Sequence, residues 1–367
     1  MPHWVEVNFG PVHPSAHGIY RFKVLLDGEI VKDVDIQIGY LHRNAEKICE
    51  LNPYPDAIIY FDRMDYLDAM NMELGYLTAV EKLTGIEPPE RAIWIRMIMA
   101  ELSRLAARLV GLGALGLDFG MLTPFFHCFI EREKIQKIFV EASGGRQEVN
   151  YMSIGGIYQD FTDKIIDDIK AFIEQFKKRL EDIYNQFIHS EIFYERNNNI
   201  GILEKETALD YGVTGPLLRS TGVPYDIRRV EPYLFYDKVN FDVPISNKKD
   251  NLARFVIRVE EMRQSIKIIE QCISKIPSGP YFNPKAKKSL MLRITGNGEA
   301  YSRIESDKGE FGVYIVGNGT TKPYRVHVRS PAFKNLSVLP ELARGYMIAD
   351  LISIIGTIDA VTGEVDR

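Results

Sequence analysis

The stretch Gly10-Pro11-Val12-His13-Pro14-Ser15-Ala16-His17-Gly18 places two of the seven histidines of the chain four residues apart. Pro11, Pro14 and Gly18 keep this stretch out of regular structure, because proline fixes φ and removes a backbone donor. Pro14 also restricts His13 to extended conformations, so the two rings need not share one helical face. The stretch therefore predicts a loop that can hold two titratable rings near one ligand.

The sequence leaves two interpretations of this histidine pair open. Most histidine pairs are structural, and this one has neither the intervening Glu nor an obvious third ligand of an HExxH zinc site. We therefore expect no metal here. The alternative is a functional pair facing one ligand.

Composition narrows the possible classes of protein. With 367 residues and 46% hydrophobic content, the chain can bury a large core in two or three subdomains. A net charge of -5, with no long basic run, argues against a nucleic-acid partner. Cys49, Cys128 and Cys272 make no CxxC pair, which argues against a disulfide framework or a cysteine-bound metal and suits a reducing cytoplasm. We also expect neither a signal peptide nor a membrane-spanning segment.

The hydrophobic pattern predicts an α+β fold with three parts. Alternation around the turn at Asp27-Gly28 predicts a β-hairpin in an N-terminal antiparallel sheet. Helical periodicity predicts a central bundle of long helices, and alternation around Asn318-Gly319 predicts a second hairpin. We place the domains at 1–50, 51–205 and 206–367. The predicted helices span about 45–50, from 62 to the Pro88-Pro89 break, 91–112, 123–141, 163–188, 250–276 and a buried last helix at 340–355.

Two features inside the predicted bundle have structural explanations of their own. The methionines of the helices lie at core spacing, which favours packing over a cofactor site. Asp118 stands among apolar and small residues, so it is either a helix cap or a buried carboxylate that needs a partner.

Six motifs in a fixed order resemble the quinone-site subunit of respiratory complex I, the 49 kDa subunit family, a relative of the nickel-iron hydrogenase large subunit. Together they span nearly the whole chain. They are the segment 10–18, Gly39-Tyr40-Leu41-His42-Arg43, Asp62-Arg63-Met64-Asp65-Tyr66-Leu67, residues 118–126 with Glu131-Arg132-Glu133, Thr214-Gly215-Pro216 with Leu218-Arg219, and residues 355–367.

The hydrogenase branch holds its nickel-iron centre with four thiolates in two CxxC pairs. The corresponding positions here are Asp65, Asp68, Val361 and Glu364, so no thiolate remains and hydrogen chemistry is excluded. The resemblance implies that the space of the lost metal became a pocket for the quinone headgroup, with Asp65 as a supporting residue.

The resemblance also implies roles for single residues. Tyr66 would hydrogen-bond one quinone carbonyl and His17 the other, while Asp118 would orient His17 and compensate its charge. His13 would shape the same loop and belong to the quinone-binding residues. Arg43 would lie near the interface with the iron-sulfur partner.

This family implies a large assembly around the chain. Electrons would come from an iron-sulfur cluster in a small partner subunit, since this chain lacks the cysteines for one. Other peripheral-arm and membrane-arm subunits would complete a proton-translocating oxidoreductase, with this chain peripheral on the cytoplasmic, stromal or matrix face. NADH, ferredoxin or reduced deazaflavin would all enter through other subunits. The alternatives are a scaffold that has lost quinone chemistry, and a related complex with a non-quinone acceptor.

Two positions depart from the usual family pattern. Members often carry a histidine where this chain has Arg108 and an arginine where it has Ser153. We therefore expect a partner interface or cluster environment different from the common form. Losing a fixed positive charge at Ser153 would lower the reduction potential of a nearby cluster, which allows a lower-potential donor such as ferredoxin.

Overall fold

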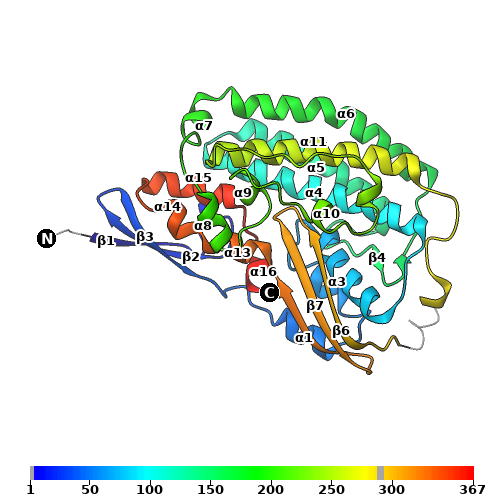
Figure 1. Cartoon of the computed structure of the whole chain (residues 1–367). Helices are drawn as coiled ribbons and strands as arrows, with labels where there is room; N and C mark the ends of the chain where they lie inside the picture. The colour runs from blue at the N-terminus through cyan, green and yellow to red at the C-terminus, as the bar shows by residue number, and fades with distance from the viewer. Residues whose placement is uncertain (1–3, 287–292) are drawn as a thin grey trace.

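The fold, seen in a computed structural model that describes residues 4–286 and 293–367, is α+β, as the sequence predicts (Figure 1). A stack of long helices forms the upper layer in this view. One small antiparallel sheet lies at the left and a second below the helices.

The N-terminal sheet contains the predicted hairpin and one further strand. Its strands are β1 (Trp4–Phe9), β2 (Arg21–Asp27) and β3 (Ile30–Gln37), antiparallel in the order β1-β2-β3. The sequence prediction lacked β1, whose side chains are mostly exposed and so carry no clear buried alternation. The loop with the two histidines joins β1 to β2, and therefore starts and ends on neighbouring strands.

The long helices confirm the predicted bundle. They are α3 (Ala69–Thr84), α4 (Glu90–Asp118), α5 (Leu122–Ser143), α6 (Asp163–Ile188) and α11 (Asn251–Lys275). Two bounds differ from the prediction. Helix α3 begins at residue 69 rather than 62, because the Asp65 carboxylate accepts the backbone N–H groups of Leu67 and Asp68 and holds a turn there. Helix α4 continues beyond 112, and its glycines pack closely, Gly111 against Asp359 and Gly116 against Phe187.

The second sheet lies under α3. Its strands are β6 (Asn297–Glu305), β7 (Glu310–Asn318) and β8 (Pro323–Arg329), in the order β6-β7-β8. Strands β7 and β8 form the predicted hairpin. Gly75 of α3 packs directly on the ring of Phe311, which brings the helix close to the sheet.

Short elements connect these layers. They are α1 (Ala45–Leu51), α2 (Ile58–Phe61), β4 (Met152–Ser153), β5 (Gly156–Ile157), α7 (Glu191–Glu195), α8 (Lys205–Asp210), α9 (Pro216–Arg219), α10 (Ile227–Val230), α13 (Pro331–Ser337), α14 (Leu339–Ala343), α15 (Ile348–Ile358), α16 (Thr362–Asp366) and two 3₁₀ turns, Pro14–Ala16 and Tyr236–Lys238.

The single terminal helix predicted for 340–355 was wrong. The chain forms α14 and α15, separated at Gly345, whose φ of +85° ends the first helix. Gly345 donates to the carbonyl of Val31, and Val31 donates to the carbonyl of Tyr346, so the break pairs with β3. A long-range contact thus overrides the local helical pattern. Helices α15 and α16 are both largely buried, and α16 lies in the middle of the molecule.

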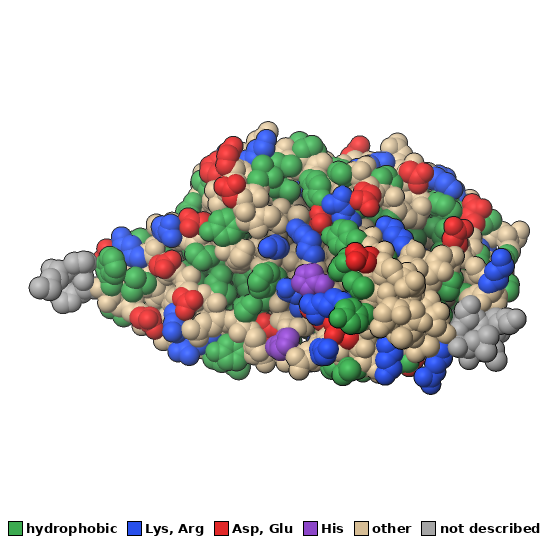
Figure 2. Space-filling view, turned by 60° about the horizontal axis from the view of Figure 1, so that its bottom comes forward, with side chains coloured by type: hydrophobic (Ala, Val, Ile, Leu, Met, Phe, Trp, Pro, Cys, Tyr) green, Lys and Arg blue, Asp and Glu red, His purple; other side chains and the backbone are tan. Residues whose placement is uncertain are grey.

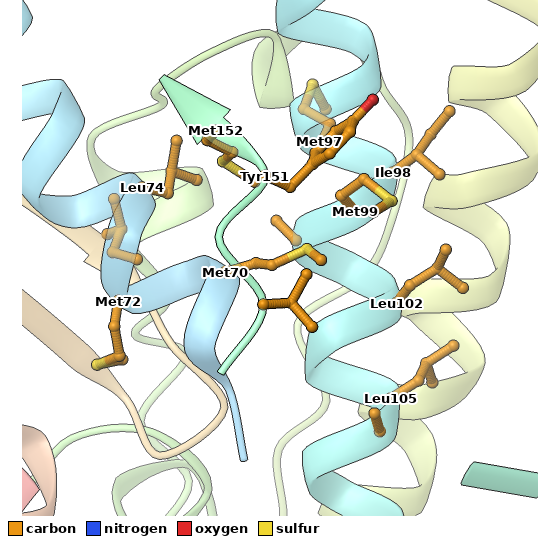
Figure 3. Packing of buried hydrophobic residues seen from close by; sticks show 14 of the residues in the cluster. Met70, Met72, Leu74, Met97, Ile98, Met99, Leu102, Leu105, Tyr151 and Met152 are labelled. Carbon is orange, nitrogen blue, oxygen red and sulfur yellow. The ribbon is translucent and has the colours of Figure 1, made fainter. Parts of the chain in front are cut away.

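The buried hydrophobic residues form two clusters. One joins the long helices to the second sheet, and the other joins the N-terminal sheet to α13, α14 and α15. Figure 3 shows Met70, Met97 and Met99 among aliphatic side chains of the first cluster, which confirms that these methionines are core residues. None of the helices in the described ranges combines enough length and apolar character to cross a membrane. The domain bounds stay a prediction.

Candidate functional site

The loop between β1 and β2 is fixed on the C-terminal helix. Gly18 lies so close to Thr362 that an added Cβ would come 2.2 Å from its Oγ1 atom, so only glycine fits. The backbone N–H of Ile19 donates to the same Oγ1 at 3.0 Å. His17 adopts the left-handed conformation, with a φ of +53°, at the end of the short 3₁₀ turn. The loop is therefore held by α16 rather than by its own secondary structure.

His17 points at the carboxylate that ends α4. Its Nε2 lies 2.6 Å from Oδ2 of Asp118, and both side chains are at most a tenth exposed. Burial alone would lower the pKa of His17. The hydrogen bond and charge of Asp118, with the charge of Asp359, outweigh burial and raise that pKa above its ordinary value. Asp118 is thus both the last residue of its helix and the partner of a buried imidazole.

A glycine of α15 makes room for this pair. A Cβ on Gly356 would come 3.0 Å from Oδ2 of Asp118 and 3.5 Å from Nε2 of His17. The close approach of α15 therefore closes one side of the His17–Asp118 pair.

His13 lies apart from that pair. Its ring is exposed, accepts a hydrogen bond from the Ser15 backbone at 3.2 Å, and packs on Phe9 with ring centroids 4.0 Å apart. Among the hydrogen bonds of the described residues, none joins His13 to His17, Tyr66 or Asp118. Its contacts shape the loop.

Tyr66 directly follows the buried Asp65 in the sequence, and its side chain borders a cavity. Its side chain is 43% exposed and borders a hollow of about 330 Å³, together with Val110, Phe129 and Glu148. Burial and the negative charge of Asp65 raise the pKa of the phenol, while the cations Lys308 and Arg43 oppose that shift. A phenol in this environment keeps its proton until a strong base forms beside it.

Helix α16 contacts both parts of the site. Thr362 contacts the histidine loop, and Gly363 packs against the backbone carbonyls of Arg63 and Met64, just before Tyr66 in the sequence. A Cβ on Gly363 would lie 2.6 Å from the Met64 oxygen. The backbone of Gly363 therefore sets how close the two segments approach.

The segment Gly39 to Arg43 binds the other end of α16. The Asp366 carboxylate accepts the N–H groups of Gly39 and Leu41 at 2.8 and 2.6 Å, and His42 Nδ1 lies 2.6 Å from the Asp366 carbonyl. Arg43 donates to the Arg63 carbonyl at 2.6 Å. Sequence reasoning alone read His42 and Arg43 as a polar junction. The structure shows instead that His42 binds the end of α16, while Arg43 binds the segment just before Tyr66.

Figure 2 shows histidine side chains beside a group of basic side chains on one face of the molecule. On the surface of the protein, Arg325, His327 and Arg367 lie within 4 Å of the Glu46 carboxylate. This surface is close to α16, because Arg367 directly follows that helix.

The four residues that the resemblance assigns to the metal-ligand positions of the hydrogenases are buried. Asp65, Asp68 and Glu364 are 0% exposed and Val361 is 4% exposed. In the described part of the chain, no group of three His, Cys, Asp or Glu side chains is arranged to hold a metal ion. A lysine contacts part of this group instead: Nζ of Lys308, in the turn between β6 and β7, lies 2.5 Å from Asp307 and 4.0 Å from Asp65.

Sequence reasoning missed Lys308, Asp307 and Asp359 in this region. A charged turn between two strands normally faces solvent, so neither residue type nor spacing distinguished Asp307-Lys308-Gly309. The useful signal would have been the buried carboxylates Asp65 and Glu364, which need a cation.

Both departures from the family pattern are inside the protein. Arg108 is 1% exposed and donates to Glu261 at 2.8 Å, and Ser153 is 2% exposed. The guanidinium of Arg96 donates to the Ser153 carbonyl at 2.7 Å, so a positive charge stands beside this position. Neither side chain forms part of the outer surface.

Comparison with known proteins places the chain in one family. The family model described as "Respiratory-chain NADH dehydrogenase, 49 Kd subunit" matches residues 118–367. A protein of Desulforamulus reducens, named as a subunit of NADH-quinone oxidoreductase, is 46% identical, over 98% of this chain and 97% of its own length. Proteins of the same name from Chlorobaculum tepidum and Ehrlichia chaffeensis are 44% and 41% identical, over 98% and 99% of this chain and 92% and 98% of their own lengths. The chain belongs to the family of the 49 kDa subunit of respiratory-chain NADH dehydrogenase.

Proposed function

We propose that this chain is the quinone-site subunit of a complex I type oxidoreductase. It takes electrons from an iron-sulfur cluster in a small partner subunit and passes them to a quinone, which becomes a quinol. The observation that carries the proposal is the buried His17–Asp118 pair, held at 2.6 Å by a loop seated on α16, in a chain of this family.

Two protons must accompany the two electrons that reduce a quinone. His17 serves one quinone oxygen, because the Asp118 charge keeps its ring protonated to a higher pH than an ordinary histidine. Tyr66 serves the other oxygen, because a phenol with a raised pKa donates only toward a developing quinolate. His13 shapes the binding loop, and Arg43 and Asp65 support the site.

Loss of the His17 proton leaves Asp118 as a buried carboxylate without its cation. We propose that this change of charge drives proton translocation in membrane-arm partners. It would be refuted if Asp118→Asn left both quinone reduction and pumping unchanged.

The proposed assembly contains other peripheral-arm subunits and a membrane arm, with this chain peripheral on the cytoplasmic, stromal or matrix face. NAD or another donor binds to other subunits. The name "NADH-quinone oxidoreductase" of the relatives supports quinone as acceptor and NADH as donor.

The test is isolation of the native complex in mild detergent through an N-terminal tag, followed by mass spectrometry and a quinone reductase assay. An N-terminal tag avoids α16, whose residues are buried. We expect a small iron-sulfur subunit and membrane subunits to co-purify with quinone reductase activity. Recovery without an iron-sulfur partner would support a scaffold, and activity only with another acceptor would support the non-quinone alternative.

A further inference from the structure

Two groups of buried charges in this protein differ in how their cations and carboxyl groups balance. Beside α11, four arginines and four carboxylates form one connected set of ion pairs. These residues are Arg104, Arg108, Arg219, Arg228, Glu101, Asp226, Glu261 and Glu305. Since cations and anions are equal in number, the charges of this set cancel.

The second group, near Tyr66, is not balanced. It contains five carboxyl groups, which we call the buried carboxyl cluster, and two cations, Lys308 and Arg258. The cluster comprises Asp65, Asp68, Asp307, Asp359 and Glu364, each at most 8% exposed. Two further cations whose charges reach the cluster, Arg104 and Arg108, already pair with Glu101 and Glu261. Three of the five carboxyl charges therefore have no matching cation.

Lys308 is at the centre of this cluster. Its Nζ lies 2.5 Å from Asp307 Oδ2, 3.2 Å from Asp359 Oδ2 and 4.0 Å from Asp65 Oδ2. The second cation, Arg258, approaches only Asp359, at 3.8 Å. Negative charges therefore meet around one ammonium group.

Several carboxyl oxygens of the cluster lack partners. Asp65 accepts two backbone N–H groups through Oδ1, whereas its buried Oδ2 makes no hydrogen bond to the described residues. Glu364 accepts from Ser330 and Ala332 through Oε1, and its Oε2 is likewise without a partner in the described ranges. An oxygen that accepts nothing and lies out of water is a favourable place for a proton.

Burial and neighbouring carboxylates act in the same direction. They raise the pKa of Asp65 well above its ordinary value, and those of Asp68 and Glu364 to about 7. Asp307 differs, because Lys308, with the charges of Arg104 and Arg108, lowers its pKa despite burial. Burial would also lower the pKa of Lys308, but its carboxylates raise that pKa and keep the ammonium charged. Together with the unpartnered oxygens of Asp65 and Glu364, these shifts favour a proton on Asp65 and partial protonation of Asp68 and Glu364 at neutral pH.

The cluster acts on both proposed proton donors of the site. Burial raises the pKa of the Tyr66 phenol, and Asp65 raises it further once its carboxyl has lost the proton, while Lys308 and Arg43 oppose that effect. The charge of Asp359 raises the pKa of His17 from the other side, together with Asp118. The phenol and the imidazole are thus connected electrostatically through Lys308 and its carboxyl partners.

Building on the proposed function, we infer that the buried carboxyl cluster is a proton store that refills Tyr66 and His17 after they protonate the reduced quinone. Two electrons from the partner's iron-sulfur cluster and two protons, one from the phenol O–H and one from the imidazolium N–H, convert quinone to quinol. Two cluster carboxyls then lose their O–H protons, one to the phenolate and one to the imidazole, and become carboxylates near Lys308. Two protons taken up from bulk solvent restore these carboxyls before the next turnover.

The protonation of the buried carboxyl cluster can be measured in the resting complex, without quinone reduction. Infrared spectra of the oxidised complex, recorded across pH in H₂O and D₂O, should show the C=O band of protonated carboxylic acids at neutral pH. Asp65→Asn, which keeps the Oδ1 acceptor, should weaken this band. Lys308→Met should strengthen it, because the acids then lose their cation. Absence of the band, or no response to either variant, would overturn the store. This measurement needs no quinone chemistry, so its failure is distinct from failure of the proposed function.

Pre-steady-state kinetics can show whether the buried carboxyl cluster returns protons to Tyr66 and His17. With excess donor, Glu364→Gln, which keeps the Oε1 acceptor, should reduce the first quinone per complex at the wild-type rate and later quinones about tenfold more slowly or worse. Equal slowing of the first and later turnovers would overturn the refilling role. If Glu364→Gln does not assemble, Asp65→Asn provides a second variant, judged by the ratio of the later to the first turnover rate, which should fall below the wild-type ratio.

The controls separate charge from structure. Asp167→Asn changes an exposed carboxylate of α6 and should leave the band and both kinetic phases unchanged. Lys308→Arg keeps the charge and should retain the wild-type band, whereas a bound metal cation in place of protons would give no carboxylic acid band in any variant. That last result would also refute the store.

Discussion

Nε2 of His17 lies 2.6 Å from Oδ2 of Asp118, although the two residues are 101 positions apart in the sequence. Residues 10–18 and the end of α4 meet there because α15 packs against both at Gly356, while Thr362 of α16 holds the loop. The pair therefore depends on the last two helices of the chain as much as on its own two segments.

Asp118→Asn should shift the pH dependence of quinone reduction to lower pH. Asp118 holds the His17 pKa above its ordinary value, so removing the charge lets the ring lose its proton earlier as pH rises. The measurement is the pH–rate profile of the isolated complex. Asp167→Asn is the matched control, and an unchanged profile in Asp118→Asn would contradict the assignment.

The same pair predicts how stability depends on pH. Because the folded-state pKa of His17 is raised, its contribution to stability is full below the unfolded value of about 6.5. That contribution is then lost as pH rises through the raised folded value. Unfolding midpoints across this window should fall more steeply in the wild type than in Asp118→Asn. Parallel curves for the two proteins would contradict the prediction.

Tyr66→Phe should slow quinone reduction roughly 10²-fold and leave assembly intact, because the variant removes only the phenol O–H. The readouts are the rate with saturating quinone and the subunit composition of the purified complex. Tyr324→Phe, at a 68% exposed tyrosine, is the control and should behave like the wild type. A normal rate in Tyr66→Phe would remove this residue from the site.

Gly356→Ala should disturb the pair without changing any titratable group. The new Cβ would come 3.0 Å from Asp118 Oδ2 and 2.9 Å from a Leu115 methyl group, which predicts about 1–3 kcal/mol of strain. We expect a lower thermal midpoint and a lower quinone reduction rate. Gly145→Ala meets nothing closer than 3.6 Å and serves as control. Wild-type behaviour of Gly356→Ala would mean that α15 can move away.

Arg108→Met should destabilise the fold by about 3 kcal/mol, because it removes one of the two cations that pair with the buried Glu261. Thermal unfolding of the purified chain measures this. Arg344→Met, at an exposed ion pair, should shift the midpoint much less. Equal effects of the two variants would show that the buried charge set contributes no more than a surface pair.

Periodicity predicted the parts of the fold that depend on local pattern. The β2–β3 hairpin followed from Asp27-Gly28 between alternating segments, and α6 has the bounds that its apolar face predicts. Long-range contacts caused the errors. Gly345 ends α14 where the chain pairs with Val31, and Asp65 delays the start of α3 with its own hydrogen bonds.

The site was predictable only in part, for the same reason. The resemblance singled out His17, Asp118 and Tyr66, and the structure gives His17 and Asp118 a direct contact. Lys308 could not be found from its surroundings in the sequence, since its partners Asp65 and Asp359 come from distant segments. His13 shares the loop with His17 but has separate contacts.

The position of α16 has a consequence for biosynthesis. Residues 362–366 support the loop of residues 10–18 and bind the segment 39–43, so these segments wait for partners that are 325 to 343 residues later in the chain. While the chain is still on the ribosome, its N-terminal hairpin can form, but the His17 loop lacks its contacts with Thr362. A chain whose synthesis stops before residue 362 therefore lacks the contacts of α16 that hold the site together, even if its other helices fold.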